Sequence, residues 1–122
     1  MSQKELAISF LKMVAARNIR EAYDKYIAPG FIHHNQYCKG DRQSLMVAME
    51  SAADKHPHKT LEVKQAFEDG NTVITHSYVK QSPDDAGGAV VHIFRFENGR
   101  VVELWDLGQP IVKDSPNDHG AF

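Results

Sequence analysis

Several protein classes are excluded by what this sequence lacks. Cys38 is the only cysteine among 122 residues, so the chain has neither an internal disulfide nor a CxxC zinc site. No apolar run approaches the ~20 residues of a membrane-spanning helix, and no apolar signal-peptide segment follows the first residues. The formal net charge of −2 provides no basic surface for nucleic acid or an anionic membrane. We therefore expect a cytoplasmic protein that binds neither nucleic acid nor membranes.

Recognisable catalytic motifs are also absent. The chain has no glycine-rich phosphate loop, no nucleophile elbow and no HExxH metal motif. Cys38 follows Tyr37 in an expected turn, and no neighbouring residue supports a nucleophilic role. The sequence therefore predicts no cofactor.

What is present is typical of a globular domain. Hydrophobic residues make up 42% of the chain and charged residues 25%, which are ordinary values. A chain of 122 residues can bury one sizeable core. We expect a single domain over residues 1–122, with a polar tail from about residue 109 that extends over a pocket or over a dimer partner.

Helical patterns come first along the chain and strand patterns follow. Helices are expected after Ser2 and Asn18, each with a glutamate three residues later as in a capping box, and from Asp41 to about Asp54. Strands are expected over residues 31–37, 60–67 and 72–80 and in a hairpin over 90–107.

This order predicts an α+β fold. A curved, cone-shaped antiparallel sheet of four long strands plus a short strand would pack on three N-terminal helices. The open end of such a cone can hold a pocket for a small organic molecule. The other face of the sheet still has apolar residues to cover, so we expect a homodimer through the sheet.

The hairpin carries two titratable residues on otherwise apolar strands, His92 and Asp106. Burying an imidazole or a carboxylate is costly unless it has a partner or a function. A three-residue loop with Gly99 as a left-handed bulge would place both side chains on one face, whereas a two-residue Asn98-Gly99 loop would place them on opposite faces. The residues alone are compatible with both loops.

Seven histidines are the one compositional oddity: His33, His34, His56, His58, His76, His92 and His119. On a strand the adjacent His33 and His34 point to opposite faces, so they are poor joint metal ligands. A zinc or iron site built from His34, His76 and His92 with Asp106 is one alternative, although dispersed histidines are a weak metal signal.

Two segments resemble a known family, namely Phe31-Ile32-His33-His34-Asn35 and Val91–Phe96 followed by Gly99–Asp106. With the order of elements, they resemble the SnoaL-like polyketide cyclases, within the superfamily of ketosteroid isomerase and nuclear transport factor 2. The resemblance implies the cone-shaped fold. It also favours the Gly99-bulge register, with His92, Leu104 and Asp106 turned into one cavity and Trp105 turned away.

The resemblance further implies a catalytic set of His92, Asp106 and His34. Asp106 would remove a proton next to a carbonyl, and the resulting enolate would attack a second carbonyl. His92 would donate a hydrogen bond to the enolate oxygen. In ketosteroid isomerases the catalytic base is an aspartate, and His34 falls at or next to its position. Their oxyanion-hole aspartate aligns with His92. The isomerase pattern is therefore broken at both positions.

Further residues are predicted to line the pocket: His76, Tyr26, Asn35, Ile74, Tyr78, Leu104 and Met49. The alternative interpretations, which the residues favour, are a core aromatic for Tyr26 and an interior histidine with satisfied hydrogen bonds for His76. If the protein is an enzyme, we expect cofactor-independent acid–base chemistry of the aldol or isomerase type. The alternatives are a pocket that binds a small apolar ligand without catalysis, the metal site, and a purely structural hydrogen bond between His92 and Asp106.

Overall fold

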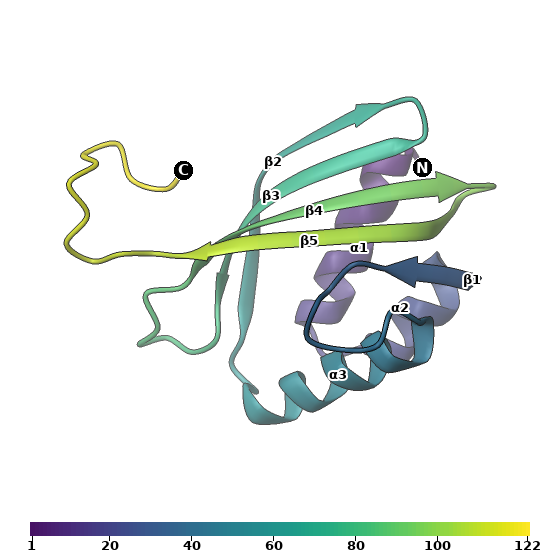
Figure 1. Ribbon diagram of the computed structural model, residues 1–122, viewed down its shortest axis with the longest axis horizontal. Helices are drawn as coiled ribbons and strands as arrows, with labels where there is room; N and C mark the ends of the chain where they lie inside the picture. Colours follow the sequence, from purple (N-terminus) through teal and green to yellow (C-terminus); the bar gives the residue numbers. More distant parts are fainter.

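The computed structural model describes all 122 residues and confirms the predicted order of elements. Three helices and a short strand precede four long strands (Figure 1). The elements are α1 (Gln3–Ala15), α2 (Ile19–Tyr26), β1 (Ile27–His33), α3 (Arg42–Lys55), β2 (Thr60–Asp69), β3 (Thr72–Lys80), β4 (Gly88–Glu97) and β5 (Arg100–Pro110). None of the helices has the length and apolar character that crossing a membrane requires.

The strands form one open sheet in the order β1-β5-β4-β3-β2. Strands β2 to β5 are antiparallel, whereas β1 runs parallel to β5 at the sheet edge. The short strand was expected over residues 31–37 and lies earlier, at Ile27–His33. It accommodates Pro29 because an edge strand pairs on one side only, where a missing N–H is tolerated.

Local capping explains two of the three helix starts. At α1, Ser2 and Glu5 form the predicted reciprocal capping box, and at α3 the Asp41 side chain accepts a hydrogen bond from the Ser44 N–H. At α2 the helix begins directly after Asn18 as predicted, but the predicted capping hydrogen bond is missing. Asn18 makes no side-chain cap bond, because its backbone (φ −94°, ψ 57°) lacks the extended conformation that an N-cap usually has.

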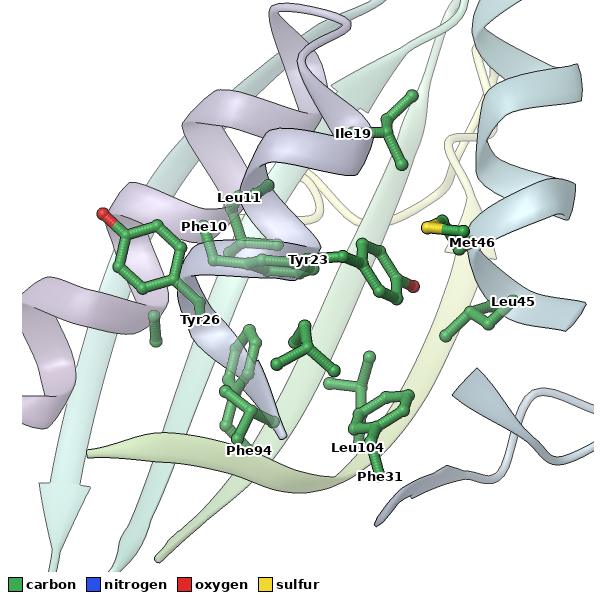
Figure 2. Close-up of a cluster of buried hydrophobic side chains, with 14 of the residues drawn as sticks. Phe10, Leu11, Ile19, Tyr23, Tyr26, Phe31, Leu45, Met46, Phe94 and Leu104 are labelled. Atoms are coloured by element: carbon green, nitrogen blue, oxygen red, sulfur yellow. The ribbon is translucent and has the colours of Figure 1, made fainter. Parts of the chain in front are cut away.

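Aromatic side chains form the centre of the core between the helices and the sheet. Phe10 contacts Tyr23 and Phe94 edge-to-face, with ring centroids 5.7 Å and 6.3 Å apart. Figure 2 shows Leu45 and Met46 of α3 approaching the same cluster from the other side. Full burial of such a side chain contributes roughly 1.5–3 kcal/mol, so this cluster holds all three helices against one face of the sheet.

The two faces of the sheet differ in what covers them. On β3, Val73, Thr75, Ser77 and Val79 are buried on the inner face, beneath the helices. The alternate residues point to the outer face, which no helix covers (Figure 1). The sequence predicted cover on both sides of this strand; the helices cover one side, and the outer side is only partly covered.

The hairpin between β4 and β5 combines the two-residue turn with a bulge further along. Asn98 and Gly99 both have positive φ (51° and 77°), and Glu97 pairs with Arg100. The register then shifts by one residue, with Val102 as the extra residue on β5. The predicted three-residue loop is therefore wrong, but the predicted facing is confirmed.

Candidate functional site

A cavity of about 300 Å³ lies between α1, α3 and the inner face of the sheet. Apolar side chains contribute 12 of its 17 lining residues, so its wall is poor in hydrogen-bonding groups. A volume of this size suits a small organic ligand. The remaining lining residues are Asn35, Lys59, Gln81, His92 and Asp106.

The extra residue in β5 positions Asp106 in this cavity. Without the bulge at Val102, Asp106 would face the outer side of the sheet. The loop after β1 is fixed beside it, since the His34 N–H donates a 3.0 Å hydrogen bond to the carbonyl of Leu104. From this loop Asn35 Nδ2 donates to Asp106 Oδ2 at 3.1 Å. Oδ1 has no hydrogen bond within the chain and remains available to a ligand.

His92 lies directly opposite Asp106 on the neighbouring strand β4. Its Nδ1 is buried and has no hydrogen-bond partner. Burial lowers the pKa of His92 to about 4, despite the opposing attraction of the Asp106 carboxylate. The imidazole is therefore neutral at pH 7. The purely structural interpretation of the pair is wrong, because no hydrogen bond joins the two side chains and Asp106 is bonded to Asn35 instead.

Lys59 adds a cation to the cavity wall. It occupies the position just before β2, and its half-buried side chain lines the same cavity as His92. Burial lowers the pKa of Lys59 below its ordinary value. Its positive charge in turn helps to lower the pKa of His92.

Two uncharged side chains, those of Tyr23 and Cys38, lie near the Asp106 carboxylate. The Tyr23 hydroxyl donates to Met49 Sδ at 3.3 Å, and burial raises the pKa of this tyrosine well above its ordinary value. Cys38 Sγ lies 3.8 Å from His33 Nε2. Burial, with the nearby Asp106 carboxylate, raises the pKa of the thiol. Tyr23 and Cys38 are therefore protonated at neutral pH.

The family model for the SnoaL-like domain matches residues 7–104, most of the chain. The chain belongs to the SnoaL-like family. A comparison with curated proteins found no match.

Solved structures agree with this SnoaL-like assignment. An NTF2-like protein of unknown function from Cytophaga hutchinsonii has 18% identity and a TM-score of 0.73, with 90% of this chain and 92% of that chain covered. A candidate polyketide cyclase from Acidithiobacillus ferrooxidans has 19% identity and a TM-score of 0.74, with 89% and 92% covered. A candidate isomerase of the SnoaL-like family from Agrobacterium tumefaciens has 14% identity and a TM-score of 0.69, with 89% and 99% covered. At these identities the likeness shows the fold.

The SnoaL-like fold brings four of the predicted site residues to the cavity wall. These are His92, Asp106, Asn35 and Met49. Leu104 and Tyr26 lie instead in the packed core, 1% and 4% exposed. Figure 2 shows the Tyr26 hydroxyl pointing away from α3. Their predicted place in the pocket wall is wrong, because neighbouring aromatic side chains fill the space in front of them.

The prediction that His34 belongs to the catalytic set is wrong on geometry. His33 takes the inward position on β1, so its neighbour points to the outer face. There the His34 ring stacks on Trp105 with ring centroids 4.8 Å apart. Its Nε2 lies 2.7 Å from a carboxylate oxygen of Glu103. His34 is thus separated from Asp106 by the sheet.

Three further predicted pocket residues also lie on the outer face, namely Ile74, His76 and Tyr78. His76 Nδ1 is 3.0 Å from Gln65 Nε2. The tail after β5 returns to this face, where the Phe122 ring lies 5.1 Å from the His76 ring and 5.3 Å from the Tyr78 ring. The tail residues do not line the cavity.

The same geometry rules out the histidine metal site expected as an alternative. His34 and His76 lie on the outer face, whereas His92 and Asp106 lie on the inner face. No three His, Cys, Asp or Glu side chains of the chain converge as a metal site would require.

Sequence reasoning missed Lys59 and Gln81. Both lie where a strand begins or ends, Lys59 before β2 and Gln81 after β3, and neither belongs to a motif. The antiparallel pairing of Thr60 with Lys80 brings the two positions together at the cavity. Recognition of that pairing was the only signal that could have found them.

Proposed function

We propose that this SnoaL-like protein binds a small organic carbonyl compound in the cavity and removes a proton from the carbon next to the carbonyl. The observation that carries the proposal is the placement of Asp106 and His92. They lie opposite each other on neighbouring strands, in an apolar cavity and without a hydrogen bond between them. A base and a hydrogen-bond donor that do not bind each other are available to a substrate between them.

Asp106 is the proposed base. Asn35 fixes one carboxylate oxygen, and Oδ1 is left to accept the substrate proton. The electron pair of the broken C–H bond moves into an enolate. The enolate carbon then attacks a second carbonyl, as in a cyclisation, or takes the proton back at another carbon, as in an isomerisation. Both reactions share the first step, and the geometry supports that step.

His92 is the proposed donor to the enolate oxygen. Its pKa of about 4 keeps it neutral, so it has one N–H to donate and carries no charge that would pair with Asp106. A fixed donor in a mostly apolar cavity needs little reorganisation as charge develops on the substrate oxygen.

Proton exchange tests the first step directly. In D₂O, wild-type protein should accelerate deuterium incorporation next to the carbonyl of a small ketone such as 2-tetralone, followed by NMR. We expect Asp106→Asn to lower this rate by about 10²–10⁴-fold and His92→Gln by about 10²-fold. Asp118→Asn, in the exposed tail, is the matched control and should leave the rate unchanged. Equal rates in wild type and Asp106→Asn would refute the assignment.

A second function is favoured by the wall of the cavity, which is mostly apolar. The cavity could bind a small apolar ligand without changing it. In that case neither wild-type protein nor Asp106→Asn would accelerate exchange, while both would bind the same ligand with similar affinity.

We also propose that the outer face of the sheet pairs with a second copy of the chain. Large apolar side chains are exposed there, among them Phe67, Ile74 and Leu107. Apolar surface of this kind is stabilised by burial, and a self-complementary two-fold contact is the commonest arrangement.

A further inference from the structure

Lys59 is the only lysine or arginine that lines the cavity. Its ammonium forms no ion pair, and its side chain makes no hydrogen bond within the chain. Burial alone lowers its pKa. An unpaired, half-buried positive charge destabilises the folded protein unless an anion from solution binds to it.

The other half-buried cations of this protein have partners. Arg95 binds the Glu103 carboxylate at 2.9 Å, and Arg42 lies 3.9 Å from an oxygen of Asp24. Lys59 departs from this pattern, and it does so in the wall of the mostly apolar cavity. A negatively charged ligand in the cavity would supply the ion-pair partner that Lys59 lacks.

The cavity is also polarised. His92 is affected by both Asp106 and Lys59, with opposite effects on its pKa. In the sheet order, His92 on β4 lies between Asp106 on β5 and the β2 edge where Lys59 lies, so the two charges lie toward different ends of the cavity. An anionic group of a ligand would be repelled at the Asp106 end and attracted at the Lys59 end. Such a ligand has one favourable orientation.

We infer that the cavity takes a small organic anion, a keto acid or similar compound, whose negative group binds Lys59 while its acidic C–H lies at Asp106. The position of the C–H rests on the proposed function, whereas the charge of the ligand rests on Lys59 alone. Gln81, which lines the same wall, offers a side-chain amide as a second donor to the anion. Lys59 thereby selects the class of ligand and sets its orientation.

Two probes that differ only in charge test this inference. 2-Naphthoate and 2-naphthamide have the same ring system and nearly the same size, and their affinities can be measured by isothermal titration calorimetry. Wild-type protein should bind the carboxylate more tightly. Lys59→Met should lower the affinity for naphthoate about tenfold, the effect of a lost charged contact of about 1.4 kcal/mol, and leave that for naphthamide within about twofold. Lys59→Arg should keep the preference.

Lys55→Met is the matched control. It removes the same charge from an exposed position in the last turn of α3, four residues away and outside the cavity wall. It should therefore leave the ratio of the two affinities unchanged. Because Lys59→Met removes a costly buried charge, it should fold at least as stably as wild type, and Lys59→Gln provides a second neutral variant.

The inference is overturned if wild type and Lys59→Met show the same ratio of affinities, or if wild type binds no naphthoate up to its solubility limit. Its failure is distinguishable from that of the proposed reaction. Loss of deuterium exchange in Asp106→Asn with no charge preference would leave the base assignment and remove the anion site. A charge preference that depends on Lys59, without any deuterium exchange in wild type, would support the anion site and remove the base assignment.

Discussion

Burial keeps the His92 side chain neutral, and this makes the stability of the protein depend on pH. In the unfolded chain a histidine binds a proton near its ordinary pKa of 6.5, whereas His92 in the fold does so only near about 4. Between these values the unfolded state binds more protons than the folded state. The free energy of unfolding therefore falls as the pH falls from about 6.5 to about 4, and this contribution is constant above and below that window.

We predict that His92 contributes on the order of 3 kcal/mol, as an upper limit, to the loss of stability across this window. Urea unfolding at a series of pH values should show a shallower decline for His92→Gln than for wild type. His58→Gln, at an exposed position, should follow the wild-type curve. Parallel curves for wild type and His92→Gln would contradict the burial of a neutral imidazole.

Only part of the site was predictable at the level of residues. The residues alone left open whether His92 and Asp106 share a face; the family resemblance favoured one face, and the structure agrees. The choice between His33 and His34 was not predictable, because either residue of an adjacent pair can face inward. Lys59 was not predictable because its place in the wall depends on strand pairing and on how α3 connects to β2.

At the level of elements, the hairpin of β4 and β5 determines the site. The sequence predicted a hairpin here but left its turn open between two and three residues, and the structure has the two-residue Asn98-Gly99 turn. The bulge at Val102 was not predictable, because nothing in the neighbouring β-branched residues marks the one left unpaired. Bulges reflect how the twisted sheet meets the core, which is a property of tertiary packing.

The turn provides a test with an internal control. Gly99 has a φ of 77°, whereas Gly30 has no positive φ, and at both positions an added Cβ would meet nothing within 4 Å. We expect Gly99→Ala to lower the free energy of unfolding by about 1–2 kcal/mol through backbone strain alone. Gly30→Ala should have a much smaller effect. Equal effects in chemical denaturation would show that the turn does not need the left-handed conformation.

At the level of the whole molecule, the unequal faces of the sheet separate two tasks. The inner face builds the core and the cavity, and the outer face offers apolar surface. The layered α+β class was predictable, because helical periodicity gives way to strand periodicity near residue 60. The parallel pairing of β1 with β5 at the sheet edge was not, since it joins segments about 70 residues apart in the chain.

The proposed dimer predicts a response to charge on the outer face. Ile74 on β3 is 39% exposed there, so Ile74→Lys should convert a dimer to a monomer in analytical ultracentrifugation. Val47→Lys, at an exposed position on α3 on the other side of the sheet, should leave the dimer intact. A wild-type protein that sediments as a monomer at high concentration would refute the proposal.

The single extra residue at Val102 has an evolutionary consequence. A deletion of one codon between Val101 and Glu103 would restore uninterrupted pairing in the hairpin. Because Val102 is the residue without a partner, every later side chain of β5 would keep its side, with Asp106 still opposite His92. The turn and the first part of the hairpin would be unchanged. Descendants of this fold can therefore lose the bulge by a one-residue deletion and still keep the acid in the cavity.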